Sequence, residues 1–448
     1  MDDLFKYPTY LPSTFGGLMP NEEIPWHSGE CTLKFGDKDF VGEASLKYTF
    51  TPQQRLTIES TLSGLHTGLN QAGWSGSASL PTFWHGQSFK VERTANSYGD
   101  GETRVRCIVP ELVVGDQSHF AEVRFHLLNG PEYKGETVST GKGVVGARCS
   151  LSDGEWAFDI DSLKYQRTQE QREDIKRSAG FHVSHVCRLR RIDANQFTHQ
   201  SAMKVTGELF KFLAFANGGY AGMIQFLAYD DNSNEIGAFD PGYRVSPRPW
   251  GRTWLSDRAD IDLNAVYQGY LTRYRDTNWQ RSIDLAIYWY VAAIQMHGGI
   301  EGSLILALSA IQSLAWRYFV TTTGKYSATA FKALNAAPQL REMLVECGIP
   351  AQVPSHLTAL SQIASNPAFA DGVGSIVKIR NCYTHPEPSN DAFLQSLPQD
   401  YEYEAWLLAL NYLELILLWL FSYNGKYSNR LSTATFLGAE VDKVPWAI

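Results

Sequence analysis

A long apolar run near the C-terminus sets the strongest limit on how this chain can fold. Residues 407–421 read LLALNYLELILLWLF, in which Asn411 and Glu414 are the most polar side chains. A membrane-spanning helix needs about 20 mostly apolar residues, so this run is short for a span. We expect instead a helix that other helices cover on most sides, as in the core of a bundle. No membrane partner is predicted.

A second apolar segment supports the same bundle. Residues 303–320 contain Gln312 and Arg317, which again favours a buried helix over a span. Proline and glycine divide the surrounding sequence into shorter helical pieces. We expect helices at about 279–297, 300–322, 327–335, 338–347, 355–364, 370–385 and 401–424.

The first half of the chain has a residue pattern that is typical of strands. Short runs rich in β-branched and aromatic residues alternate with turns of Gly, Pro and Asp, which is typical of an antiparallel sandwich or barrel. A helix is expected at about 201–216, followed by one or two returning strands at 222–231. The other expected strands cover residues 44–50, 55–62, 87–93, 103–109, 121–128, 155–161 and 181–192.

The strand-rich pattern of the first half and the helical pattern of the second half predict an α+β chain of more than one domain. Its 448 residues exceed what one hydrophobic core usually supports. We expect an antiparallel β-rich N-terminal domain at residues 1–275, and an all-α helical bundle at residues 276–448.

Charge and cysteine content narrow the classes of function. The net charge of −8 argues against a surface coated in base for nonspecific nucleic-acid binding, although a local basic groove stays open. The six cysteines form no Cys-X-X-Cys pair, so neither a zinc ribbon nor a small disulfide scaffold is indicated. The N-terminus carries two acidic residues and no apolar run follows, which predicts a cytoplasmic location.

The sequence does not match the residue spacings or the number of ligands that familiar phosphate-binding, zinc-binding and hydrolase motifs require. Residues 135–143, GETVSTGKG, place five residues where a phosphate loop has four, so a hairpin turn is the better interpretation. On a strand, His182 and His185 point to opposite faces, which leaves His185 and Cys187 together and too few ligands for zinc. The sequence has neither a Gly-X-Ser-X-Gly nor a His-Glu-X-X-His motif. No metal site is predicted.

Basic and aromatic residues gather in the loop before the bundle. Guanidinium groups pair with phosphates and indole rings stack on unpaired bases, so we hypothesise an RNA-binding surface here. The alternative is a surface loop whose tryptophans plug the domain interface. The residues concerned are Arg244, Arg248, Trp250, Arg252 and Trp254.

The segment IVKIRNCYTHP, residues 376–386, concentrates polar groups in a region that is otherwise short of charge. On a helix, Asn381 and His385 lie four positions apart on one face, and Arg380 lies one step around the axis. Pro386 stops the helix, so His385 is expected at its last turn, where its imidazole can face a cleft.

These side-chain types suit RNA cleavage by attack of a 2′-hydroxyl on the adjacent phosphate. Histidine titrates near neutrality and can serve as base or acid. Arginine offers a fixed fork of donors to the developing phosphate charge, and asparagine can orient an imidazole or bind a phosphate oxygen. One copy supplies a single histidine, so two-fold pairing of two copies would supply base and acid together.

At these residues the sequence resembles the HEPN (higher eukaryotes and prokaryotes nucleotide-binding) domain. Arg380-Asn381-Cys382-Tyr383-Thr384-His385 fits the family's Arg-X4-His motif with a polar residue after the arginine, a proline follows, and a long apolar helix comes next. The resemblance covers residues 279–430, and the wider layout is similar to bacterial ApeA-type abortive-infection proteins.

The resemblance implies a metal-independent endoribonuclease without cofactor, whose dimer forms a composite site for RNA, such as transfer RNA. Arg380 and His385 would be the catalytic pair and Asn381 the supporting polar residue. The N-terminal domain would recognise a phage-derived trigger or restrain the nuclease.

One residue departs from the family pattern. Many relatives carry a glutamate on the second bundle helix, where this chain has Gln312 in SAIQSL. Tyr383 is expected to pack, although its hydroxyl could reach a phosphate.

Three alternatives stay open. The bundle could be non-catalytic and only dimerise or bind a nucleotide, or Arg380 and His385 could merely cap carbonyl groups at a helix end. The β domain could also be a carbohydrate-binding sandwich, because Trp26, Trp74, Trp84 and Trp156 stand beside polar turns.

Overall fold

The structure is a computed structural model that describes residues 7–447, except 14, 16–17, 51–52, 65, 67–68, 70–72, 178–179, 248–250, 368 and 434–437. Its described residues fall into two compact units. The first is built from antiparallel strands and the second mainly from helices, which confirms the predicted fold class. The first unit takes residues 1–130, 135–210 and 220–248, and the second takes 131–134, 211–219 and 249–448.

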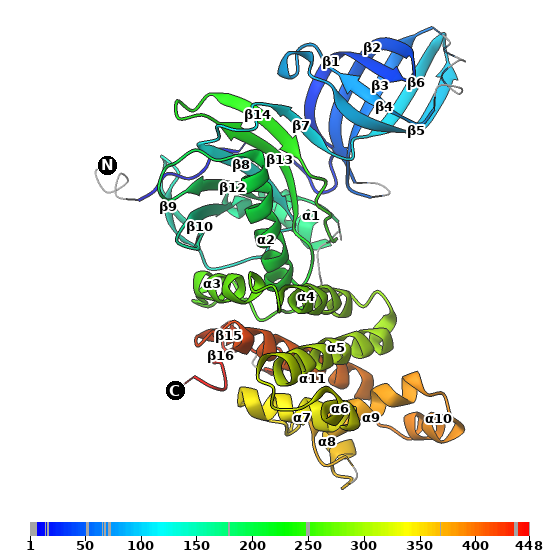
Figure 1. Cartoon of the computed structure of the whole chain (residues 1–448), viewed down its shortest axis with the longest axis vertical. Coiled ribbons are helices and arrows are strands. Elements are labelled where there is room, and N and C mark those ends of the chain that lie inside the picture. The colour runs from blue at the N-terminus through cyan, green and yellow to red at the C-terminus, as the bar shows by residue number, and fades with distance from the viewer. Residues whose placement is uncertain are drawn as a thin grey trace. The chain divides into compact units, whose positions relative to one another are not determined.

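Six strands of the first unit close into an antiparallel barrel (Figure 1). Their order around the barrel is β1-β2-β3-β6-β5-β4. Buried and exposed residues alternate along β6, because successive side chains of a barrel strand face inward and outward in turn. The strands are β1 (Ile24–Phe35), β2 (Lys38–Thr49), β3 (Arg55–Ser63), β4 (Ser75–Ser79), β5 (Phe89–Gly99) and β6 (Glu102–Ile108).

The remaining strands of this unit form one eight-stranded antiparallel sheet in the order β7-β14-β13-β8-β12-β11-β10-β9. Two helices accompany it, α1 (Gln169–Arg177) and α2 (His199–Asn217). The strands are β7 (Leu112–Gly115), β8 (Glu122–Leu128), β9 (Glu136–Ser139), β10 (Val144–Ser152), β11 (Trp156–Ser162), β12 (Val183–Arg191), β13 (Gly222–Tyr229) and β14 (Glu235–Asp240).

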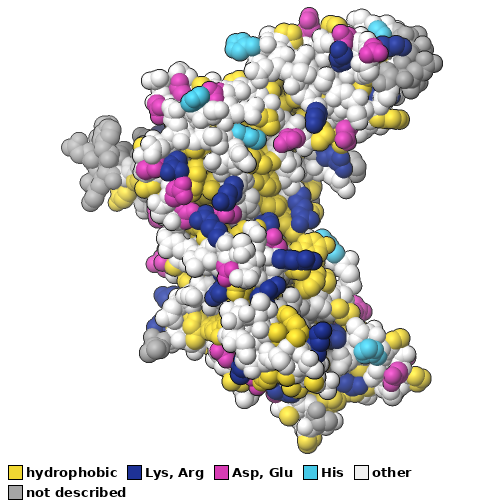
Figure 2. Space-filling model, viewed as in Figure 1, with side chains coloured by type: hydrophobic (Ala, Val, Ile, Leu, Met, Phe, Trp, Pro, Cys, Tyr) yellow, Lys and Arg dark blue, Asp and Glu magenta, His cyan; other side chains and the backbone are white. Residues whose placement is uncertain are grey.

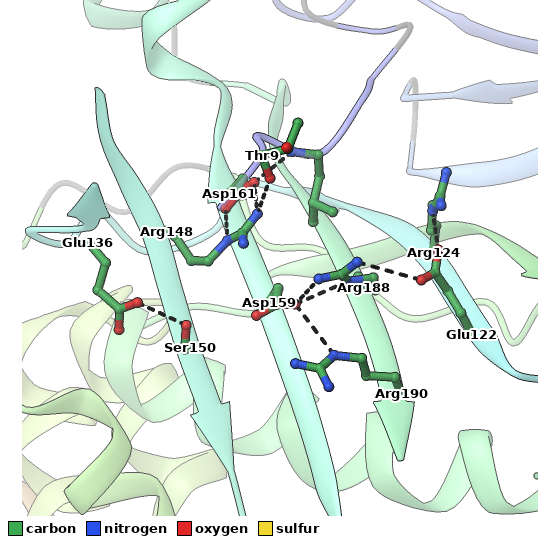
Figure 3. A network of polar contacts seen from close by, with 11 residues as sticks. Thr9, Glu122, Arg124, Glu136, Arg148, Ser150, Asp159, Asp161, Arg188 and Arg190 are labelled. Atoms are coloured by element: carbon green, nitrogen blue, oxygen red, sulfur yellow. Dashed lines mark hydrogen bonds and ion pairs between the residues drawn. The ribbon is translucent and has the colours of Figure 1, made fainter. Parts of the chain in front are cut away.

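A buried ion pair fastens the N-terminal segment to this sheet (Figure 3). Arg148 binds Asp161 through two hydrogen bonds of 2.8 and 2.7 Å, and both side chains are almost fully buried. The same guanidinium donates to the Thr9 carbonyl, and the Asp161 carboxylate accepts the Leu11 N–H. The segment also pairs with the edge strand β9, because Ser139 exchanges backbone hydrogen bonds with residues 8 and 10.

Helices dominate the second unit, and α11 lies at its centre. α11 contacts α3, α4, α5, α7, α8 and α9, and most of its residues are buried. The helices are α3 (Leu263–Tyr274), α4 (Gln280–Ile294), α5 (Gly299–Trp316), α6 (Ala328–Ala333), α7 (Ala336–Cys347), α8 (Thr358–Ala364), α9 (Gly372–Thr384), α10 (Pro388–Gln395) and α11 (Tyr401–Leu420), with a π-helical turn η5 (Arg317–Thr322) and a hairpin of β15 (Lys426–Ser428) and β16 (Val441–Lys443).

Among the residues that the structure describes, two helices are long and apolar enough to cross a membrane by length and composition alone, Gly299–Thr322 and Tyr401–Leu420. In the most apolar stretch of the second, 83% of the residues are buried inside the unit, against 44% in the first. The high burial of Tyr401–Leu420 is typical of the core helix of a bundle.

All seven strands predicted in the first half are present, as is the helix predicted at 201–216. Several elements were not predicted from the sequence. β1 was missed because Pro25 and Gly29 interrupt its apolar pattern. α10 was missed because Pro388 was interpreted as a stop, although proline is favoured in the first turn of a helix.

Replacing Arg148 with methionine should destabilise the first unit strongly. The substitution leaves the Asp161 carboxylate buried without a counter-ion, which costs about 3–5 kcal/mol. We expect a lower urea midpoint and faster proteolytic cleavage before residue 13.

Arg191→Ala is the matched control, because Arg191 forms its ion pairs with Glu155 and Asp193 near the surface of the same unit. It should leave the midpoint nearly unchanged. Equal effects of the two substitutions would contradict the role assigned to the buried pair.

Candidate functional site

The cluster predicted at residues 380–385 lies at the C-terminal end of α9. Asp371 caps the start of this helix by accepting the Gly374 N–H at 2.7 Å. Arg341 of α7 holds the same carboxylate with two hydrogen bonds of 2.5 and 2.9 Å. A Cβ atom at Gly374 would lie 2.0 Å from the Phe369 carbonyl oxygen, so glycine permits this close approach. The start of α9 is therefore fixed against its neighbours.

Arg380 is held by a chain of amide side chains. Its Nη2 atom donates to Oε1 of Gln312 on α5 at 3.0 Å. The Nε2 atom of Gln312 donates in turn to Oε1 of Gln339 on α7 at 3.1 Å. Gln339 is anchored because its Nε2 atom donates to the Phe331 and Leu334 carbonyls, each at 2.9 Å. Three helices thus position one guanidinium.

The charge of Arg380 is not neutralised within the part of the chain that the structure describes, where no carboxylate lies within ion-pair distance of it. The side chain is half-buried, and this burial lowers the pKa of the guanidinium. An arginine stays protonated regardless, so the site keeps a partly desolvated positive charge. A group of this kind favours an anion as its partner.

His385 is the residue at which α9 ends, as the following proline predicted. Its backbone leaves the helical region, at φ −131° and ψ 84°, while its N–H still donates to the Asn381 carbonyl at 2.9 Å. The imidazole is exposed, and the Asn381 side chain is half-exposed. Neither side chain forms a hydrogen bond with any residue placed by the structure.

Asn390 of α10 fixes the turn after α9, a role that the sequence did not reveal. Its Nδ2 atom donates to the His385 carbonyl at 2.8 Å. Its Oδ1 atom accepts from Lys378 at 2.7 Å and from the Cys382 thiol at 3.4 Å. The two helix ends around His385 are therefore tied together by one side chain. The roles of Asn390 and Gln339 could not be predicted, because neither residue belongs to a recognisable sequence motif.

Tyr383 points to a different set of partners. Its hydroxyl donates to Glu402 of α11 at 2.9 Å and lies 3.4 Å from the Tyr401 hydroxyl. Burial and the neighbouring carboxylate raise the pKa of Tyr383 far above its usual value. This bond ties α9 to the start of α11, in line with the packing role expected for it.

The proposed RNA-binding loop is only partly described. Arg248 and Trp250 lie outside the described residues. Arg244 is exposed, with its guanidinium 3.7 Å from the centre of the Tyr220 ring, and Arg252 is also exposed.

Trp254 corrects the hypothesis about this loop. It is fully buried in the second unit, where it stacks on Phe215 and donates from Nε1 to the Phe215 carbonyl at 3.1 Å. An indole without exposed surface cannot stack on a base. The ring of Trp254 instead packs in the hydrophobic core of the second unit.

Several other basic residues of the first unit form ion pairs with carboxylates. Arg188 pairs with Asp159 and Glu122, as Figure 3 shows. Acidic and basic side chains are also intermixed over the face drawn in Figure 2. Among the described residues on that face, basic side chains do not form a continuous positive surface that would suit a polyanion.

The histidine and cysteine group on β12 does not resemble a metal site. His185 is buried, its Nδ1 atom lies 2.9 Å from the Ser184 hydroxyl, and burial lowers its pKa to about 3. Cys187 is also fully buried. Across the described ranges, the structure contains no group of three or more His, Cys, Asp or Glu residues that could hold a metal ion.

Comparison with known proteins finds two matching domain models. Residues 115–249 match the YopA central domain, and residues 276–441 match the YopA C-terminal domain. The chain is 23% identical over 444 residues to the SPbeta prophage-derived uncharacterized protein YopA of Bacillus subtilis (strain 168). This chain resembles YopA along nearly its whole length. The aligned region covers 97% of this chain and 98% of that relative, and no solved structure matches.

The contact between Gln312 and Arg380 can be measured by a double-mutant cycle with Gln312→Ala and Arg380→Ala. A hydrogen bond to a charged group that is half-buried should give a coupling free energy of about 1 kcal/mol in urea unfolding. The same cycle with Ser313→Ala, the next residue on α5, serves as control. A Gln312–Arg380 coupling no larger than the control would contradict the observed arrangement.

Proposed function

We propose that this protein is a metal-independent endoribonuclease of the HEPN type that acts as a homodimer in the cytoplasm. The observation that carries the proposal is the half-buried Arg380, held by Gln312 with no carboxylate partner among the described residues. It stands on the same helix end as an exposed histidine and an unbonded asparagine side chain. Phosphate is the anion that this combination of groups suits best.

The contacts of Arg380 weigh against a pure capping role. A capping arginine would donate to the free carbonyl groups at the helix C-terminus. The Arg380 side chain donates to the Gln312 amide oxygen instead, and the Arg380 carbonyl accepts from the Thr384 hydroxyl. The guanidinium is therefore aimed away from the helix end.

The glutamine at position 312 suits this function. A glutamate there would form an ion pair with Arg380 and offset its charge. The amide of Gln312 accepts one hydrogen bond and leaves the positive charge available to a phosphate. The departure from the family pattern thus alters how the arginine is held, while the guanidinium itself is retained.

In the proposed reaction, the RNA 2′-oxygen attacks phosphorus while the bond from phosphorus to the 5′-oxygen breaks. The His385 imidazole accepts the 2′-hydroxyl proton, and the partner subunit's His385 donates a proton to the leaving 5′-oxygen. Arg380 stabilises the charge on the phosphate oxygens, and Asn381 orients an imidazole or a phosphate. The products are a 2′,3′-cyclic phosphate and a 5′-hydroxyl.

The strand-rich unit would control this activity. We propose that it recognises a phage-derived trigger and that the RNA target has unpaired nucleotides, as in the loops of transfer RNA. Unstacked nucleotides can adopt the in-line geometry that attack by the 2′-oxygen requires.

RNA cleavage in the presence of EDTA tests the proposal. Total RNA is incubated with the purified protein, and RNA is also sampled from infected cells that express it. Loss of the base or of the phosphate-binding cation should lower the cleavage rate about 100-fold or more in His385→Ala and Arg380→Ala.

His119→Ala is the matched control, because His119 is an exposed histidine in the first unit. It should cleave as fast as the wild type. Cleavage by all variants alike, cleavage that EDTA abolishes, or intact RNA both in vitro and during infection would contradict the proposal.

A further inference from the structure

Lys378 is a cation of the segment IVKIRNCYTHP that the proposed reaction does not use. It lies on α9, two residues before Arg380, and its side chain is half-buried. No carboxylate among the described residues lies within ion-pair distance of its ammonium group. The sequence of α9, GVGSIVKIRNCYT, also contains no acidic residue that could offset the charge. Lys378 therefore carries a partly desolvated positive charge, as Arg380 does, and such a charge favours an anion.

The contacts of the Lys378 ammonium orient it without cancelling its charge. It donates to Oδ1 of Asn390 on α10 at 2.7 Å, and it lies 4.9 Å from the centre of the Phe393 ring. An ammonium group has three donors, and neither a neutral amide nor an aromatic ring removes its charge. The group can therefore bind an anion while it keeps the bond to Asn390.

The same contacts place the ammonium close to His385. Lys378, Asn381 and His385 follow one another at intervals of three and four residues, so they share one face of α9. The Cys382 thiol, one turn beyond Lys378, donates to the same Oδ1 atom of Asn390 at 3.4 Å, so the lysine side chain extends toward the C-terminal end of the helix. The Nδ2 atom of that amide donates to the His385 carbonyl at 2.8 Å. One amide group thus lies between the ammonium and the residue proposed as the base.

Lys378 and Arg380 point in different directions from α9. Arg380 reaches Gln312 of α5, whereas Lys378 reaches Asn390 of α10. Two positions on a helix correspond to about 200° of rotation, so the two cations are poorly placed to share one phosphate. A nucleic-acid strand carries a phosphate at every nucleotide, so a strand bound at Arg380 brings further phosphates to the helix end.

We propose that Lys378 binds the phosphate next to the scissile one on the same RNA strand. The inference rests on the proposed function, because that function places the scissile phosphate at Arg380 and His385. Lysine acts on a phosphate as a point charge and does not read the base beside it. The substrate is therefore a strand with consecutive phosphates, and its binding at Lys378 does not depend on the base sequence.

The salt dependence of RNA binding tests this role without any cleavage. The full-length protein is titrated with a 2′-O-methyl RNA of about ten nucleotides, which lacks the attacking 2′-hydroxyl, between about 50 and 300 mM NaCl. Each phosphate contact of a single strand contributes about 0.7 to the slope of log Kd against log salt concentration. In Lys378→Met we expect the slope to fall by about 0.7, or by about 1.4 if Lys378 of the partner subunit contacts the same strand. The Kd at the lowest salt concentration should rise about tenfold.

Two further variants separate the charge of Lys378 from its structural bond. Lys378→Gln keeps a donor for the Asn390 amide but carries no charge, so its slope should fall as in Lys378→Met. Lys378→Arg keeps the charge and should retain the slope of the wild type. Lys443→Met is the matched control, because Lys443 is exposed on β16, which lies away from α9 and α10 in Figure 1. A thermal melt of each variant shows that it is folded.

The result of this titration is independent of the cleavage assay. Binding with the expected slopes but without RNA cleavage would support the role of Lys378 and contradict the endoribonuclease proposal. Cleavage with unchanged slopes in Lys378→Met and Lys378→Gln would do the reverse. The role of Lys378 would also be overturned if the wild type did not bind the 2′-O-methyl RNA, or if Lys443→Met lowered the slope equally.

Discussion

The second unit depends on one constraint, which is that α11 must be covered on nearly all sides. This 20-residue helix is apolar along most of its length, so packing it away from water contributes a large hydrophobic term to the stability of the unit. Six other helices surround it. α9 is one of them, and its start is fixed by the Asp371 cap and its side by the bond from Tyr383 to Glu402. The position of Arg380 and His385 follows from this packing.

Polar side chains in the apolar interior around α11 must either form hydrogen bonds within the protein or bind another molecule. Glu414 is satisfied by Arg430 and Tyr290, and removing Arg430 would leave the Glu414 carboxylate buried without a counter-ion. Arg380 is bonded by a neutral amide and keeps its charge. The proposed active site depends on this contrast, because its guanidinium carries a charge that no carboxylate among the described residues offsets.

Much of this organisation could be predicted from the sequence, because it depends on local patterns. The apolar run at 407–421 predicted a covered helix, and Pro386 predicted that α9 ends at His385. What could not be predicted depends on contacts between distant segments. Gln339 reaches Gln312 from 27 positions away, and Trp254 looked like a surface residue until its contact with Phe215 placed it in the core. Closure of the barrel likewise follows from strand pairing that no single segment encodes.

The chemistry of the RNA ends tests the central claim most directly. If His385 and Arg380 promote attack by the 2′-hydroxyl, the RNA that this protein cuts must carry 2′,3′-cyclic phosphates and 5′-hydroxyls. End-specific sequencing of RNA from cells that express the wild type should find these ends, and they should disappear with His385→Ala. Ends with 3′-hydroxyls and 5′-phosphates would show hydrolysis by an activated water and would contradict the account.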